Sequence, residues 1–167
     1  MSILISDTSV LIDLERAHLI EAVFTLPMRF GVPDLLFDRE LRSYGGDALL
    51  ALGLEVMELD SAGVQLAQTY RAREVRISLP DAFALALAKG GTHDLLTGDG
   101  PLRALAEAEL VPCHGVLWVF DQFAEKGSVS PAILHECLSL LFSHPRCRLP
   151  RKEVQVRLHQ LAARSQG

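Results

Sequence analysis

The stretch ILISDTSVLIDL, residues 3–14, joins two kinds of secondary structure. Its first part, Ile3–Ser6, is mostly apolar, which predicts a short strand buried on both faces. From Ser9 onward, apolar residues recur at helical spacing, which predicts a helix over about residues 9–26. Asp7 lies at the junction. The chain therefore begins with a strand–helix unit that carries an acid where the strand ends.

The alternation of strands and helices continues along the chain. Short apolar runs predict further strands at residues 29–32, 54–59 and 94–97, and a fifth within residues 111–119. The expected helices cover residues 34–52 with a break near Gly45-Gly46, residues 63–74, the segment from Ser78 to Gly90-Gly91, residues 101–108, and a segment that ends at Gly127. This order predicts an α/β fold in which helices flank a central parallel sheet.

Two more amphipathic helices are expected at the C-terminal end. One begins at Ser130-Pro131 and carries an apolar stripe, and the other carries a narrower stripe. The stripe residues are Leu134, Leu138 and Leu141 in the first helix, and Val154, Leu158 and Leu161 in the second. We therefore predict an α/β domain over residues 1–125 and a helical C-terminal extension over residues 126–167, packed on that domain or projecting from it.

The composition favours a cytoplasmic enzyme or binding protein over a membrane or disulfide-rich protein. Hydrophobic residues make up 49% of the 167 residues, which suffices for a full core in one domain. No apolar run approaches the roughly 18 residues of a membrane span, and the start of the chain lacks the basic segment of a signal peptide. The three cysteines form no C-x-x-C pair, so a structural zinc site is not expected.

The net charge of −5 is unevenly distributed. Six basic residues and one acid give residues 146–167 a net charge of +5, which leaves −10 for residues 1–145. A basic segment on an acidic body is typical of proteins with a polyanionic partner. A solvated helix face explains the same charges, and both interpretations stay open.

Four acids lie where a predicted strand ends or a predicted helix begins: Asp7, Glu40, Asp81 and Asp99, with separations of 33, 41 and 18 residues. Taken singly, each has a structural explanation as a helix cap, a first-turn acid, a solvated residue or a turn residue. In an open α/β sheet, however, the carboxyl ends of the strands form one crevice, and these positions are expected to meet there.

Carboxylates gathered in one crevice repel one another unless a cation lies between them. Oxygen ligands without cysteine or histidine at metal spacing indicate a hard cation, Mg²⁺ or Mn²⁺. Hydrolysis of a phosphodiester is the first candidate reaction for such a centre. The hydroxyls of Thr97, and of Thr8 or Ser9, are expected to orient a carboxylate or a bound water.

Four motifs resemble those of PIN-domain nucleases, a group that includes the VapC-like ribonucleases of toxin–antitoxin pairs. They are SDTSVLIDL at residues 6–14, VPDLLFDREL at 32–41, LPDAFALALA at 79–88 and LLTGDGPL at 95–102. The resemblance covers roughly residues 3–120. It implies a parallel sheet flanked by helices, a Mg²⁺- or Mn²⁺-dependent endoribonuclease acting on RNA, often a homodimer, and for a toxin a cognate antitoxin protein.

Carried over by position, Asp7, Glu40, Asp81 and Asp99 match the acidic, metal-binding quartet of that family, and Thr97 matches its hydroxyl. Asp38 and Asp34 are alternatives to Glu40. In a helix, Asp38 points about 200° away from Glu40, so only one of these two can face the site. The segment after about residue 120 departs from the pattern, because it is longer and more basic than a minimal PIN domain needs.

Two other functions are considered. A phosphohydrolase of the haloacid-dehalogenase type would use Asp7 as its nucleophile, but that chemistry wants a second aspartate two residues later, where this chain has Ser9. A non-catalytic RNA- or protein-binding module of the same fold is the third hypothesis.

Overall fold

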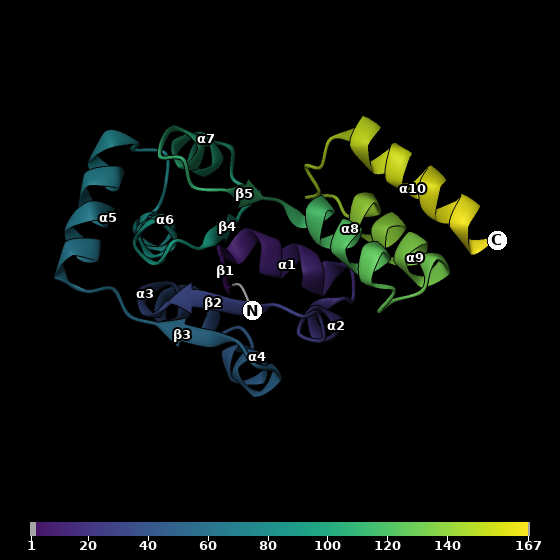
Figure 1. Ribbon diagram of the computed structural model, residues 1–167, viewed down its shortest axis with the longest axis horizontal. Helices are drawn as coiled ribbons and strands as arrows, with labels where there is room; N and C mark the ends of the chain where they lie inside the picture. The colour runs from purple at the N-terminus through teal and green to yellow at the C-terminus, as the bar shows by residue number, and fades with distance from the viewer. Residues whose placement is uncertain (1–2, 167) are drawn as a thin grey trace.

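A parallel sheet forms the centre of the computed structural model, which describes residues 3–166 (Figure 1). Among these residues the sheet has five strands in the order β3-β2-β1-β4-β5. They are β1 (Ile3–Ser6), β2 (Arg29–Pro33), β3 (Glu55–Met57), β4 (Asp94–Leu96) and β5 (Cys113–His114). Every pair of neighbouring strands is parallel. The prediction of an α/β fold with a central parallel sheet is confirmed.

Helices connect the strands and continue beyond the last one. They are α1 (Thr8–Arg16), α2 (Ile20–Val23), α3 (Asp34–Leu36), the π-helical turn η1 (Phe37–Leu41), α4 (Gly46–Leu52), α5 (Ser61–Arg73), α6 (Leu79–Gly91), α7 (Gly100–Ala108), α8 (Val116–Lys126), α9 (Pro131–Ser143) and α10 (Arg151–Ser165). Figure 1 shows α5, α6 and α7 on one side of the molecule and α8, α9 and α10 on the other.

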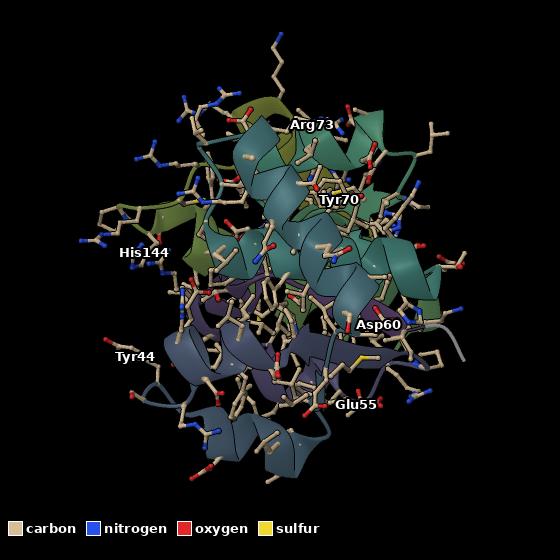
Figure 2. All side chains as sticks on the ribbon, turned by 90° about the vertical axis from the view of Figure 1, so that its left-hand side faces the viewer. Tyr44, Glu55, Asp60, Tyr70, Arg73 and His144 are labelled. Atoms are coloured by element: carbon tan, nitrogen blue, oxygen red, sulfur yellow. The ribbon has the colours of Figure 1, made fainter. Side chains whose placement is uncertain are left out.

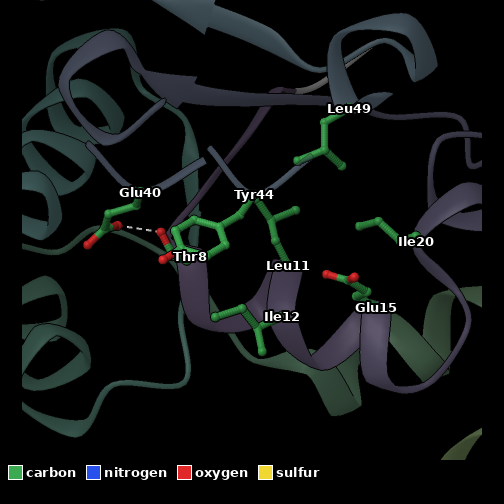
Figure 3. Close-up of a pocket in the computed structure, with 8 residues that line it drawn as sticks. All are labelled: Thr8, Leu11, Ile12, Glu15, Ile20, Glu40, Tyr44 and Leu49. Carbon is green, nitrogen blue, oxygen red and sulfur yellow. Dashed lines mark hydrogen bonds between the residues drawn. The ribbon is translucent and has the colours of Figure 1, made fainter. Parts of the chain in front are cut away.

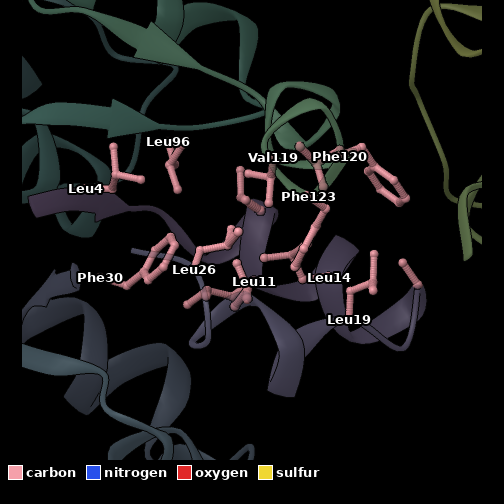
Figure 4. Packing of buried hydrophobic residues seen from close by; sticks show 14 of the residues in the cluster. Leu4, Leu11, Leu14, Leu19, Leu26, Phe30, Leu96, Val119, Phe120 and Phe123 are labelled. Carbon is pink, nitrogen blue, oxygen red and sulfur yellow. The ribbon is translucent and has the colours of Figure 1, made fainter. Parts of the chain in front are cut away.

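The central strand β1 separates two hydrophobic clusters. Leu4 belongs to the larger cluster, which α1, α8 and the C-terminal helices cover, and the neighbouring Ile5 belongs to the smaller one beneath α5, α6 and α7. Successive side chains of a strand point to opposite faces, so adjacent residues of one strand contribute to different clusters. Figure 4 shows Leu4 in the larger cluster together with Phe30 and Phe123.

The C-terminal helices share the larger cluster. Leu134, Leu138 and Val154 are fully buried in it, and α9 packs against both α8 and α10. The apolar stripes expected in these two helices therefore face the α/β core. The division at residue 125 stays a prediction, although the core is continuous across that position. Within residues 3–166, no helix combines the length and the apolar character needed to cross a membrane.

Three predicted elements differ in detail. The helix expected over residues 9–26 is interrupted at His18, which takes a positive φ of 59° between α1 and α2. The helix expected over residues 34–52 consists of α3, η1 and α4. In the segment 111–119, only Cys113–His114 is a strand, because α8 already begins at Val116.

Candidate active site

Asp7 follows the central strand and caps the helix after it. The register pairs Ser6 of β1 with Leu96 of β4, and the Asp7 amide continues this pairing by donating to the Leu96 carbonyl over 2.9 Å. The side chain then turns inward. Its Oδ1 atom accepts hydrogen bonds from the Val10 amide at 3.2 Å and from the Ser9 hydroxyl at 2.7 Å. Asp7 is therefore held rigidly at the carboxyl end of β1.

Burial makes the Asp7 carboxylate costly to ionise. Its side chain is only 2% exposed. Burial raises the pKa of Asp7 to about 7, and the charge of Asp81 adds to this rise, while the hydrogen bonds from Thr97, Ser9 and Val10 oppose it. The charge of Asp81 thus acts on Asp7, although 74 positions of the chain separate the two aspartates.

Thr97 connects two of the predicted site residues. It is fully buried at the end of β4. Its hydroxyl donates to Oδ2 of Asp7 and accepts a hydrogen bond from the Asp99 amide at 2.9 Å. The turn that holds Asp99 is also tied to the turn after β1, because the Gly98 amide donates to the Ser9 hydroxyl over 3.0 Å. Asp7, Thr97 and Asp99 are therefore parts of one hydrogen-bonded unit.

Asp99 and Asp81 both lie at the start of a helix. Oδ2 of Asp99 caps α7 by accepting from the Leu102 amide at 2.9 Å. Asp81 forms a reciprocal capping box with Ser78 at the start of α6. Burial raises the pKa of Asp81, and the negative charge of Asp99 raises it further, against the opposing hydrogen bonds from Ser78. Asp81 is thus the first-turn acid behind Ser78 that the sequence suggested, whereas Asp99, which was explained as a turn residue, is the N-cap of α7. Both acids have these structural roles, and the charge of Asp99 nevertheless acts on Asp81.

Glu40 lies on η1 and faces α1. Its carboxylate accepts a hydrogen bond from the hydroxyl of Thr8, the residue next to Asp7. Figure 3 shows this pair at one end of a groove of about 270 Å³, which Leu11 and Tyr44 help to line.

The two alternatives to Glu40 make different contacts. Asp38 is exposed and pairs with Arg42 at 2.5 Å on the outer side of η1. Oδ1 of Asp34 accepts from the amide of the next residue, Leu35, at 2.7 Å. Of these three acids, only Glu40 contacts the turn after β1 in the described structure, which covers residues 3–166.

Comparison with known families agrees with this geometry. The model of the family DUF3368, described as a PIN domain, matches residues 3–163. The chain belongs to this PIN-domain family. PIN domains are typically nucleases, and they generally bind divalent metal ions. The matched region includes α9 and most of α10, so the C-terminal helices fall within the family's own pattern. A comparison with curated proteins found no match.

The donor set fits a hard divalent cation in its chemistry, although the side chains are not arranged as a finished metal site. Among residues 3–166, no three Asp, Glu, His or Cys side chains lie together in a group able to hold an ion. Asp7 and Asp81 nevertheless have raised pKa values that arise partly from neighbouring carboxylates. A cation between them would remove that repulsion, and carboxylate oxygen is the ligand that Mg²⁺ and Mn²⁺ prefer.

Two arginines that precede α6 form ion pairs with structural roles. Arg73 lies 3.5 Å from Glu109, which also accepts a 2.7 Å hydrogen bond from the Tyr70 hydroxyl, and Figure 2 shows Arg73 and Tyr70 along α5. Arg76 pairs with Glu74 at 2.8 Å. These two arginines therefore help to hold α5 and the loop after it.

Sequence reasoning missed the group formed by His114 and its neighbours. The His114 ring stacks on Trp118 with a centroid separation of 4.1 Å, and Nε2 lies 2.9 Å from Oδ2 of Asp94. The sequence carried no signal for this group, because the three residues belong to different elements and match no motif. Trp118 is half-buried on α8 and packs against the larger hydrophobic cluster.

Proposed function

We propose that this PIN domain is an endoribonuclease that hydrolyses RNA phosphodiester bonds with the help of Mg²⁺ or Mn²⁺. The observation that carries the proposal is the hydrogen-bonded unit of Asp7, Thr97 and Asp99, to which Asp81 is electrostatically coupled. The unit joins the connections that follow β1 and β4 at the carboxyl edge of the sheet, where α/β enzymes form their sites, and Asp81 lies at the start of α6.

In this proposal Asp7, Glu40, Asp81 and Asp99 hold the cation. Such an ion supplies Lewis-acid chemistry, because it polarises a phosphate and eases the loss of a proton from water. The protein prepares the site for it. Thr97 and Ser9 fix the two oxygens of Asp7, and the Thr8 hydroxyl orients Glu40. Fixed carboxylates lose little conformational freedom when they bind an ion, which favours binding.

The same contacts disfavour the phosphohydrolase alternative. That chemistry needs a second aspartate two positions after Asp7 as its general acid. The residue two positions later is Ser9, and its hydroxyl donates to Asp7. The non-catalytic binding module is the alternative that the experiment below separates from a nuclease.

The proposal retains the partners that the resemblance to VapC-like ribonucleases implies and the location that the composition favours. They are a second copy of the chain, a cognate antitoxin protein for a toxin role, and a cytoplasmic location in which RNA and Mg²⁺ are available. The groove beside Glu40 is where we expect protein contacts, because Ile12 and Tyr44 line it and are 39% and 79% exposed. Light scattering tests whether a second copy binds, because it measures the molar mass in solution. If two copies meet at this groove, the wild type should be a dimer and Tyr44→Ser a monomer.

Activity is tested by incubating the purified protein with single-stranded and structured RNAs in Mg²⁺, Mn²⁺ or EDTA. We expect cleavage in either metal and none in EDTA. Asp7→Asn, Asp81→Asn and Asp99→Asn should each remove most of it, because the amide keeps the shape of the ligand but removes its charge. The control is Asp60→Asn, since Asp60 caps α5 in the same way as Asp7 caps α1 but is exposed.

The assignment of Glu40 as a ligand is tested by comparing it with Asp38, which lies on the same π-helical turn. Glu40→Gln is expected to impair cleavage strongly and Asp38→Asn to leave it near the wild-type level. RNA cleavage by Asp7→Asn or Asp81→Asn at the wild-type rate would refute the nuclease proposal. RNA binding without cleavage in either metal would leave the binding module as the function.

A further inference from the structure

A cleft continues from the acidic site toward the C-terminal extension. Gly98, the residue between Thr97 and Asp99, lines two adjoining hollows of about 440 Å³ and 470 Å³. Both hollows also share Asp13, Arg148 and Leu149. They therefore form one depression, whose outer wall is the segment 146–150 before α10. We call it the basic cleft.

Arginines dominate the charge of the basic cleft. Five line it, namely Arg16, Arg103, Arg146, Arg148 and Arg157, against the two acids Asp13 and Glu153. Arg16 lies 3.9 Å from Asp13, and Arg157 is held by Asp121 through hydrogen bonds of 2.9 and 2.8 Å. Within residues 3–166, the guanidinium groups of the other three arginines form no ion pair. Their charges are available to a ligand.

Arg103 is positioned at the point where the basic cleft meets the acidic site. One of its guanidinium nitrogens donates to the Thr97 carbonyl over 3.1 Å. A side chain at position 115 would crowd it, because a Cβ atom built on Gly115 would lie 3.0 Å from that nitrogen. A guanidinium has five N–H donors, so this single bond leaves most of them free for an anion.

We propose that the basic cleft holds the phosphate backbone of an unpaired RNA strand that enters the acidic site, with Arg103, Arg146 and Arg148 as its phosphate contacts. This inference rests on the proposed function, because it assigns a path to the same substrate. The acidic site by itself repels a polyanion, and the cleft supplies the compensating charge beside it. Hollows of this volume match sites for small molecules, which suits one or two nucleotides of a single strand better than a duplex.

The cleft also gives the basic C-terminal segment a specific role. Arg146 and Arg148 are exposed and belong to the segment that connects α9 to α10. Arg157 is already neutralised by Asp121, and Arg164 lies outside the cleft, 3.5 Å from the Ala124 carbonyl. The solvated-face interpretation therefore fits Arg164, and the polyanion interpretation fits the segment 146–150.

The test measures binding of a fluorescein-labelled oligouridylate by fluorescence anisotropy at several salt concentrations, in EDTA so that the RNA stays intact. We expect Arg146→Ala and Arg148→Ala each to weaken binding severalfold. Each should also reduce the salt slope, meaning the steepness with which the logarithm of the affinity falls against the logarithm of the salt concentration. The expected reduction is about 0.7, the value for one phosphate contact with a single strand. Arg148→Lys should restore the slope, because it keeps the charge. Arg164→Ala is the matched control and should keep the wild-type slope.

The outcomes separate this inference from the proposed function. If the wild type does not bind the oligonucleotide, or if Arg146→Ala and Arg148→Ala keep the slope of Arg164→Ala, the cleft is not the RNA path, even when cleavage in Mn²⁺ is observed. If the slopes fall as expected and no RNA is cleaved in either metal, the path stands and the nuclease proposal fails. Melting curves of each variant verify that a changed slope does not come from unfolding.

Discussion

Replacing Asp81 by asparagine should stabilise the metal-free protein and weaken its response to a divalent ion. Asparagine retains an oxygen that can accept the 3.3 Å hydrogen bond from the Ser78 amide, so the capping box is largely kept. What the substitution removes is a charge. Because burial and the charge of Asp99 raise the pKa of Asp81 in the folded state, ionised Asp81 costs stability at any pH above its unfolded pKa.

The size of the metal response follows from mass action. An ion that binds only the folded state stabilises it by about 2.7 kcal/mol at a hundredfold excess over its dissociation constant. One kcal/mol corresponds to about 2–4 °C for a chain of this length, so Mn²⁺ should raise the melting temperature of the wild type by about 5–11 °C. Loss of one ligand weakens ion binding, so Asp81→Asn should show a clearly smaller rise.

The assay is thermal unfolding followed by circular dichroism at pH 8, in EDTA and in Mn²⁺. We expect Asp81→Asn to melt above the wild type in EDTA. If Asp81 is only a helix-capping acid, its loss should instead cost about 0.3–1 kcal/mol and lower the melting temperature. Asp60→Asn, at an exposed cap, should keep the full metal response. A variant that melts lower in EDTA and still responds fully to Mn²⁺ would refute the coupling of the acids.

Two further predictions concern the site and the C-terminal helices. Because the pKa of Asp7 rises from 3.8 to about 7 on folding, the metal-free wild type should lose up to roughly 4 kcal/mol of stability as the pH rises from about 4 to about 7. Urea unfolding across this range should show the decline. An equal decline in Asp7→Asn would contradict the raised pKa of Asp7. Leu138→Ala, at a fully buried position of α9, should lower the free energy of unfolding by about 2–5 kcal/mol. Leu140→Ala, at a 44% exposed position of the same helix, should stay within about 0.5 kcal/mol of the wild type. Equal melting temperatures of these two variants would show that α9 does not share the core.

The local patterns of the sequence determined the order of strands and helices and the parallel sheet. A short apolar strand such as Ile3–Ser6 has to be buried on both faces, and Ser78 and Asp81 mark a helix start through hydrogen bonds within four residues. These interactions are local, so a single segment is enough to predict them. Asp7 and Asp99 could be assigned to one edge for the same reason, because each follows a parallel strand and the carboxyl ends of parallel strands share that edge.

Only the tertiary structure decided which side chains meet. The Thr97 hydroxyl reaches Asp7 across 90 positions of the chain, and the π-helical turn η1 places Asp38 in solvent while Glu40 meets Thr8. Spacing in the sequence could not choose between these two acids. The basic cleft could not be predicted from the sequence either. Arg103 and Arg148 belong to distant segments that come together only when α9 and α10 pack on the larger hydrophobic cluster. Contacts of this kind depend on how whole elements pack, and no local pattern encodes them.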